Sequence, residues 1–337
     1  TAMTIQAYER FVFIRLCLII ACVLQPCINL LLLYHGGNVV TISVATLVIS
    51  FLTYVVYVCY AKKVLDLKYK FDNFDKNLFK NIFVFSAFLF LNTITDQLTF
   101  STDNIILGVF SGSIMVAIYS VGSNFKNYFM AFSTSASSVF APKINKIIAE
   151  SGSDDETNEI FIRIGRIQFY IVTLILLGYI FWGRQFVYLW VGNEYSDAYW
   201  IGLLLMISVY VPCFQNIGLE IQKAKNMHKA RSVVYFLIAI VNIIITIPLS
   251  LLYGGIGAAF ATCLCMFIGT VIFMNIYNYK KVGIDIPAFW KSIFQILPGM
   301  IIPIVYGVFI NCFININSYW NLLFVILGFV LVYFYSC

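Results

Sequence analysis

Long hydrophobic stretches alternate with short polar ones along almost the whole chain. Ten of these stretches are close to the length of about 20 residues that a helix needs to cross the hydrocarbon core of a bilayer. They are residues 12–34, 39–61, 81–107, 112–140, 161–182, 198–220, 232–252, 256–279, 292–312 and 318–336. Because backbone polar groups in lipid must be satisfied within their own segment, we expect α-helices. The pattern therefore predicts an all-α, polytopic membrane protein with about ten transmembrane helices.

The composition agrees with this pattern. Hydrophobic residues make up 61% of the chain and charged residues only 11%, and the mean hydropathy is +0.91. Soluble domains average about 25% charged residues. So few charges cannot cover a water-facing surface, which excludes an ordinary soluble protein.

Basic residues gather at one set of predicted helix ends. The loops after the second, fourth, sixth and eighth stretches fall on one side of the membrane if the helices alternate in direction. These loops hold Lys62, Lys63, Lys68, Lys70, Lys76, Lys80, Lys143, Lys146, Arg163, Arg166, Lys223, Lys225, Lys229, Arg231, Lys280, Lys281 and Lys291, whereas the opposite loops hold only Arg184. By the positive-inside rule the basic side is cytoplasmic, which puts both ends of this chain in the cytoplasm. The net charge of +6 then favours anionic lipid headgroups as partners rather than nucleic acid.

An internal repeat relates two of the predicted hairpins. The first copy reads LLLYHGG (Leu31–Gly37), VAT (Val44–Thr46) and YAKKV (Tyr60–Val64), and the second reads LSLLYGG (Leu249–Gly255), FAT (Phe260–Thr262) and NYKKV (Asn278–Val282). In both copies 25 residues separate the second glycine from the first lysine, and the offset is 218 residues. That offset spans six helices, so both copies run in the same direction, as in transporters with two parallel lobes.

The repeat predicts the domain organisation. Residues 1–70 would be the last two helices of an incomplete N-terminal lobe, residues 71–282 a six-helix C-terminal lobe, and residues 283–337 two extra helices. We expect roughly 140 residues to precede Thr1, because the stretch from 81 lacks its counterpart 218 residues earlier. The missing initiating Met fits this expectation, although processing of a Met before Thr1 is an alternative explanation.

Buried charge marks the hairpin from Thr95 to Phe129. Asp96, Asp103 and Lys126 lie inside stretches that are otherwise apolar enough to span a bilayer. A charge near mid-membrane costs about 2.5–3.5 kcal/mol on insertion scales, so it normally faces a partner or a water-filled path. This placement predicts a transporter whose polar cavity is lined by the hairpin.

Helical spacing arranges these charges in stripes. Asn92, Asp96, Thr99 and Asp103 share one face of the helix over 81–107, and Ser123, Lys126, Ser133 and Ser137 nearly share one face of the helix over 112–140. Counting from the turn at 108–112, Asp96 and Lys126 lie at similar depths, about 18 and 21 Å at a rise of about 1.5 Å per residue. We hypothesise that they pair in one state of the transport cycle. A static ion pair between packed helices is the alternative.

Other positions change the picture less. Arg15 is a further cavity candidate, with snorkelling to the interface as the alternative, and Gln222 is expected at the cytoplasmic rim. Neither His35 nor His228 lies near a plausible set of metal ligands, and no glycine-rich nucleotide loop is visible. We therefore expect no metal site and no cofactor.

Three runs of sequence carry a family resemblance. TDNIILGVFSGSIMVAIYSVG (Thr102–Gly122), IQKAKNMHKARS (Ile221–Ser232) and YGGIGAAFAT (Tyr253–Thr262) resemble Wzx-type flippases of O-antigen and capsule repeat units. These belong to the multidrug/oligosaccharidyl-lipid/polysaccharide superfamily, which also includes multidrug antiporters and the lipid II flippase. The resemblance implies two six-helix lobes plus two extra helices, about fourteen in all. It also implies the bacterial cytoplasmic membrane, with a polysaccharide polymerase and chain-length machinery as partners.

The favoured function is a flippase rather than an enzyme. It would move a polyprenyl-pyrophosphate-linked oligosaccharide to the outer leaflet, because the sugars and diphosphate cannot cross hydrocarbon unaided. Lys126 would contact diphosphate or sugar, and Asp96 and Asp103 would bind a coupling cation, proton or sodium, or sugar hydroxyls. A cation-coupled antiporter of drugs or other small molecules remains the alternative. A polymerase or acyltransferase is disfavoured, because the outer loops are short.

Overall fold

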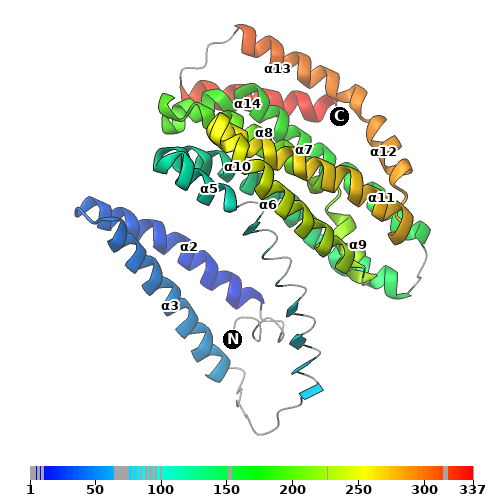
Figure 1. The fold of residues 1–337 in the computed structure, drawn as a ribbon, viewed down its shortest axis with the longest axis horizontal. Helices are drawn as coiled ribbons and strands as arrows, with labels where there is room; N and C mark the ends of the chain where they lie inside the picture. The colour runs from blue at the N-terminus through cyan, green and yellow to red at the C-terminus, as the bar shows by residue number, and fades with distance from the viewer. Residues whose placement is uncertain are drawn as a thin grey trace. The chain divides into compact units, whose positions relative to one another are not determined.

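The computed structural model describes residues 11–63, 101–150, 154–225, 227–313 and 318–336, with scattered positions before residue 11 and between 76 and 98. The secondary structure of these residues is entirely helical. The chain divides into two units, Thr1–Lys80 and Asn81–Cys337 (Figure 1).

The first unit is a hairpin of two long apolar helices, α2 (Phe11–Tyr34) and α3 (Val39–Lys63). The turn between them needs Gly36, whose φ of 80° is a left-handed conformation that a residue with a Cβ atom adopts only under strain. Inside the hairpin, the Gln25 side-chain amide donates to Thr46 Oγ1 at 2.7 Å. At the other end the rings of Phe13 and Tyr60 stack.

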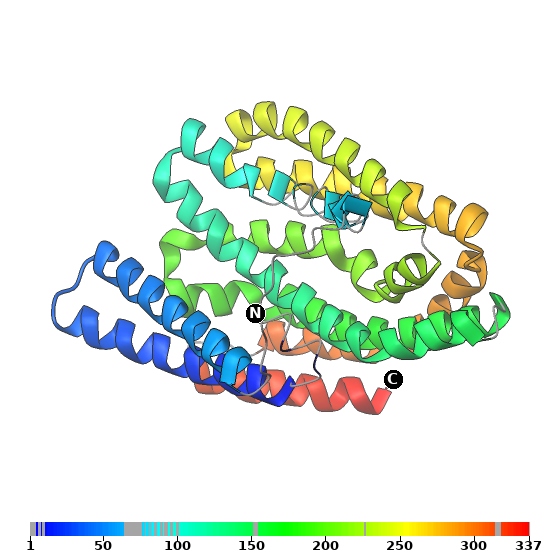
Figure 2. The ribbon, with the colours of Figure 1, turned by 90° about the horizontal axis from the view of Figure 1, so that it is seen from below.

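The second unit holds the remaining helices. They are α5 (Thr102–Phe110), α6 (Gly112–Glu150), α7 (Asp154–Val191), η1 (Asn193–Tyr195), α8 (Asp197–Phe214), α9 (Ile217–Ala224), α10 (His228–Met266), η2 (Phe267–Phe273), α11 (Met274–Tyr277), η3 (Asn278–Val282), α12 (Ile286–Phe294), η4 (Leu297–Met300), α13 (Ile301–Phe313) and α14 (Tyr319–Ser336). Helix α8 contacts α6, α7 and α10, and it lies among them in both views (Figures 1 and 2).

Seven helical stretches within the described residues are long and apolar enough to cross a membrane. One of them, Arg231–Val282, has 52 residues and contains two of the predicted crossings. The predicted span 81–107 falls mostly outside the described residues. The predicted span 112–140 is helical within α6 but is not among the seven, because its polar residues lower its hydropathy. The expectation of a multi-pass, all-helical membrane protein is confirmed.

A sharp reversal divides α10 into two arms. Gly254 has φ 57° and ψ −136°, which lies outside the helical region and is reached without strain only by glycine. A Cβ atom on the next residue, Gly255, would come within 2.9 Å of the side chains of Ile201 and Met115. The two glycines therefore provide both the turn and the close approach to α6 and α8.

The two repeat copies share local structure. The first glycine of each pair, Gly36 or Gly254, has positive φ. Each hairpin is also bridged by an amide and a threonine hydroxyl, Gln25 to Thr46 at 2.7 Å and Asn242 to Thr262 at 3.2 Å. The parallel arrangement of two lobes stays a prediction.

Helices α12 to α14 pack against α7. The Tyr333 hydroxyl donates to the backbone oxygen of Tyr170 at 2.8 Å. The predicted span 292–312 is not one uninterrupted helix, because the stretch Leu297–Met300, which contains Pro298, forms a 3-10 turn between α12 and α13.

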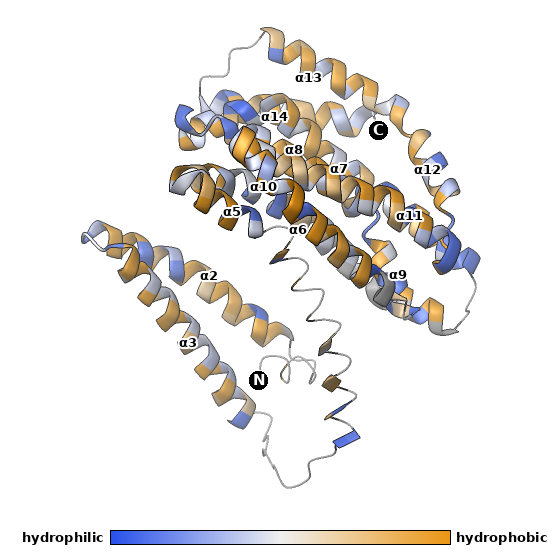
Figure 3. Ribbon diagram, viewed as in Figure 1, coloured by the Kyte–Doolittle hydropathy of each residue, from blue (hydrophilic) through white to orange (hydrophobic). Residues whose placement is uncertain are grey.

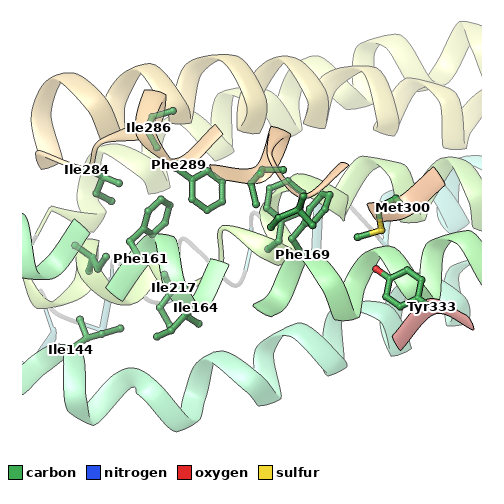
Figure 4. Packing of buried hydrophobic residues seen from close by; sticks show 14 of the residues in the cluster. Ile144, Phe161, Ile164, Phe169, Ile217, Ile284, Ile286, Phe289, Met300 and Tyr333 are labelled. Carbon is green, nitrogen blue, oxygen red and sulfur yellow. The ribbon is translucent and has the colours of Figure 1, made fainter. Parts of the chain in front are cut away.

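An apolar core joins these helices to α9 (Figure 4). Phe161 and Phe289 lie with ring centroids 4.7 Å apart, and Phe214 stacks on Phe289. A Cβ atom on Gly165 would come within 2.4 Å of the Phe289 ring, so α12 can pack here only against a glycine.

The outward faces of both units expose large hydrophobic side chains, as lipid contact requires. Leu331, Phe334 and Val109 are each about 70% exposed. Hydrophobic residues cover the lengths of the helices, and hydrophilic residues gather near helix ends (Figure 3).

Candidate functional site

Asp103 lies at the centre of a buried polar cluster in the second unit. It occupies the first turn of α5 and is 1% exposed. Its Oδ2 accepts hydrogen bonds from the Tyr119 hydroxyl of α6 and, at 2.9 Å, from the Thr262 hydroxyl in the second arm of α10. Through these hydrogen bonds the Asp103 carboxylate connects α5 to α6 and to the second arm of α10.

The first arm of α10 completes this cluster. Asn242 donates from Nδ2 to Thr262 Oγ1 at 3.2 Å, and Thr246 donates to Asn242 Oδ1 at 3.3 Å. Asn242 and Thr246 are fully buried. The resulting set of oxygen atoms, from one carboxylate, one amide and three hydroxyls, is the kind that binds hard cations.

Lys126 is the second buried charge of the unit. It lies on α6, is 4% exposed, and its positive charge acts on the Asp103 carboxylate. The structure therefore brings together Asp103 and Lys126, two of the charges expected to line a cavity. The proposed pairing of Lys126 with Asp96 stays a prediction, since Asp96 lies outside the described residues.

The other predicted site residues have different surroundings. Asn92 and Thr99, like Asp96, lie outside the described residues. Ser123 is half-buried, and its hydroxyl donates to the backbone oxygen of Ser120 at 3.0 Å. Arg15 is exposed on α2 in the first unit.

The lower part of the polar stripe on α6 holds helices together. Ser133 donates to the backbone oxygen of Cys213 in α8, and the Gln168 amide of α7 donates to Ser137 Oγ. Ser133, Ser137 and Gln168 are all buried. The two serine hydroxyls are bonded within α6 or to a neighbouring helix, so this part of the stripe contributes to helix packing. Its role in lining a cavity stays a prediction.

A cleft of about 280 Å³ lies at the basic end of the unit, between α6, α8, α9, the first arm of α10 and the segments η2, α11 and η3. Its lining includes Gln215, Gln222, Arg231 and Asn278. Gln222, which we expect at the cytoplasmic rim, lines this cleft and is 1% exposed, because η3 brings Asn278 against it. Sequence reasoning missed this site. Gln222 and Arg231 do fall within Ile221–Ser232, one of the runs that carried the resemblance.

Tyr119, Thr246 and Thr262 were also missed as partners of Asp103. Thr262 is 159 residues away from Asp103 along the chain, so no local spacing connects them. The one available signal was the repeated threonine of VAT and FAT, which contributes the Thr46 and Thr262 hydroxyls to the two hairpins.

Comparison with known proteins identifies the family of the chain. A family model described as "Polysaccharide biosynthesis protein" matches residues 4–200, more than half of the chain. No curated protein matches.

Among solved structures, the chain is similar to "Lipid II flippase MurJ, inward closed conformation". The TM-score is 0.68 at 19% sequence identity, and the match covers 92% of this chain. This chain spans 63% of the length of that structure. At this identity the likeness shows a shared fold.

Proposed function

This chain belongs to the polysaccharide biosynthesis protein family, and from that premise we propose that it forms part of a flippase for a polyprenyl-pyrophosphate-linked oligosaccharide. The flippase moves the polar head from the inner to the outer leaflet by alternating access, while the lipid tail stays in the bilayer. It is a transporter and breaks no bond. The observation that carries the proposal is the buried pair of opposite charges, Asp103 and Lys126, in a fold similar to that of a lipid II flippase.

Energetic reasoning supports a transport role for these charges. Ionisable residues at membrane depth are costly and usually mark a substrate or ion path. A purely structural ion pair could be replaced by apolar side chains at lower cost, because burying two charges carries a large desolvation penalty. The helices that carry Asp103 and Lys126 have apolar exposed faces.

The two charges take different roles in this proposal. Lys126 contacts the diphosphate or sugar of the substrate as a point charge. Asp103 binds the coupling cation, a proton or sodium, with help from the amide and hydroxyl oxygens around it. Asp96, Asn92, Thr99, Ser123 and Arg15 remain proposed cavity residues on the basis of the sequence.

The proposal extends to the cell. The protein lies in the bacterial cytoplasmic membrane with both ends of this chain in the cytoplasm, as the one-sided basic loops indicate. Its surroundings are membrane lipids, and its neighbours in the pathway are a polysaccharide polymerase and chain-length machinery, serving O-antigen or capsule synthesis.

The test uses the full-length gene, deleted and then restored as wild type, Lys126→Ala or Lys146→Ala. Lys146 is an exposed residue of the same helix and serves as the charge control. We expect deletion to trap the lipid-linked oligosaccharide at the inner face, with release by wild type and Lys146→Ala but not by Lys126→Ala at equal protein levels. Outer-face accessibility of the lipid-linked unit in the deletion strain would contradict the proposal.

A cation-coupled antiporter of small molecules is the second candidate, favoured by the oxygen-rich cluster at Asp103 alone. Under that function, expression confers resistance to toxic cations that depends on a proton or sodium gradient. Deletion would then leave the lipid-linked oligosaccharide accessible outside, so the same strains separate the two functions.

A further inference from the structure

The cleft between α9 and α10 contains polar groups that neither the fold nor the proposed transport step uses. Its volume of about 280 Å³ is slightly below that of common small-molecule pockets, about 300–1,000 Å³. Ser133 of α6 lies at its edge, 21 residues from the turn at Gly112, or about 31 Å at a helical rise of about 1.5 Å per residue. The cleft is thus at the end of the unit opposite to that turn.

Two amide side chains in the cleft have polar atoms without partners among the described residues. Gln222 donates from Nε2 to Asn278 Oδ1, which fixes its amide and leaves its buried Oε1 without a donor. Gln215 has the opposite need, because its buried Nε2 has no acceptor. Leaving such a group unsatisfied costs about 1–3 kcal/mol, so the pair indicates a ligand that both donates and accepts hydrogen bonds.

A cation lies on the same lining. The Arg231 guanidinium stacks over the Tyr235 ring at 4.6 Å, and both residues line the cleft. Arg231 has no carboxylate partner among the described ion pairs, which are Lys223–Glu220 and Lys225–Asp154. Stacking holds its planar fork in place, and that fork matches the oxygen atoms of a phosphate group.

The backbone beside the cleft is unusual. Helix α10 continues into two π-helical segments, η2 and η3, and each supplies one polar residue to the lining, Thr270 and Asn278. Wide π turns are uncommon and occur often at functional sites. Here they contribute two polar side chains to the lining of the cleft.

We propose that this cleft binds a phosphorylated polyhydroxy group, with phosphate at Arg231 and Gln215 and a hydroxyl donating to Gln222 Oε1. A glycosyl phosphate has this chemistry, and so does the headgroup of phosphatidylglycerol. Assigning it to the sugar-diphosphate end of a lipid-linked substrate, as a reception site before transport, rests on the proposed function. The binding chemistry does not, because it follows from the cleft alone.

The test measures binding of glucose 1-phosphate and of inorganic phosphate to the full-length protein in phosphatidylcholine nanodiscs by calorimetry. We expect wild type to prefer glucose 1-phosphate, because only that probe has sugar hydroxyls that can donate to Gln222 while its phosphate occupies the site at Arg231 and Gln215. Arg231→Gln should weaken both probes by about tenfold, the loss of a charge-assisted contact. Gln222→Met should reduce the preference, whereas Gln215→Met should weaken both probes because it removes a donor to the phosphate. The unfolding temperature of both variants should stay close to that of wild type.

Lys223→Gln is the matched control, since it removes a positive charge one turn from the cleft on an exposed, paired side chain. Equal binding by Arg231→Gln and Lys223→Gln, or no preference for the sugar phosphate in wild type, would overturn the proposal.

Nanodiscs with added phosphatidylglycerol separate the two sources of the ligand. Competition there assigns the site to the phospholipid, and its absence assigns the site to the glycosyl phosphate. If glucose 1-phosphate binds as expected and deletion of the gene traps no lipid-linked oligosaccharide, the binding site in the cleft is supported and the flippase function is contradicted.

Discussion

At the level of single residues, the surroundings of Asp103 decide what its charge can do. Its carboxylate receives two hydrogen bonds and the field of Lys126, yet it is enclosed by apolar helices. The two hydrogen-bond donors and the positive charge of Lys126 stabilise the buried carboxylate. Its oxygen atoms are ligands of the kind that hard cations bind.

Asp103→Asn should abolish the stabilisation of the folded protein by the coupling cation, because an amide has no negative charge to balance the charge of the cation. A cation that binds the folded state stabilises it by about 2.7 kcal/mol at 100 times its Kd. We expect the unfolding temperature of wild type to rise in sodium relative to choline if sodium is the coupling ion, and that of Asp103→Asn not to rise. Asp155→Asn, an exposed change in the first turn of α7, is the control. A sodium effect that survives in Asp103→Asn would rule out this site.

Thr262→Val should destabilise the second unit by about 1–3 kcal/mol, because it removes the hydroxyl that accepts from Asn242 Nδ2 and donates to the buried Asp103 carboxylate. Thr53→Val makes the same chemical change where the hydroxyl bonds only to its own helix, at Ile49, and should cost less. Denaturant unfolding of the two variants in detergent measures the difference. Equal effects would show that the buried cluster contributes little to stability.

Charges inside apolar stretches identified Asp103 and Lys126 as candidate site residues. The sequence did not predict the hydrogen-bond partners of Asp103. Helical spacing relates only residues one or two turns apart, and Thr262 reaches Asp103 from 159 positions away. The burial of Gln222 was not predictable for a similar reason, since it depends on Asn278, 56 residues further along.

At the level of helices, small residues set how closely α6 and α8 approach. A Cβ atom on Gly122 would lie 2.8 Å from Ile201 Cγ2 and 2.9 Å from the backbone oxygen of Ala198. Such close crossings depend on glycine, as is common between membrane helices. Hydropathy predicted both helices, but not their contact.

Gly122→Ala should therefore destabilise the protein by about 1–3 kcal/mol through overpacking. Gly178→Ala is the matched control, since a Cβ atom there meets nothing within 4 Å and the change should stabilise its helix by about 0.5–1 kcal/mol. Thermal unfolding in detergent gives the sign of each change. Destabilisation by Gly178→Ala equal to that by Gly122→Ala would refute the steric argument.

Helix ends were less predictable than helix positions. Helix α6 continues to Glu150, ten residues beyond the predicted 140, and α7 begins at Asp154, within the acidic sequence ESGSDDETNE (Glu150–Glu159). Asp154, Asp155 and Glu156 lie in the first turn of α7, where negatively charged side chains stabilise the helix by interacting with the positive end of its dipole. Hydropathy marks the part of a helix in lipid and carries no signal for its polar extension.

At the level of the whole molecule, the two repeat copies and the one-sided basic loops lead to a single membrane orientation. From this orientation we expect Gly36 and Gly254 at outer turns and the cleft with Arg231 on the cytoplasmic side. The fold class was predictable from hydropathy, because the bilayer fixes helix length, whereas the cleft depends on contacts across several helices.

Single cysteines in a cysteine-free background should reveal that orientation. We expect Asn193→Cys to react with an impermeant maleimide in intact cells, because it lies beyond the end of α7 on the predicted outer side. Asp155→Cys should react only after the membrane is opened. The reverse pattern would invert the orientation and place the cleft outside.

The most direct test of the account is movement of a labelled polyprenyl-pyrophosphate-linked oligosaccharide across liposomes that contain the purified full-length protein. The account predicts transfer that depends on a cation gradient in wild type, with loss of transfer in Lys126→Ala and loss of the cation dependence in Asp103→Asn. Transfer at the rate of protein-free liposomes, by a preparation that unfolds cooperatively and is therefore folded, would contradict the flippase function.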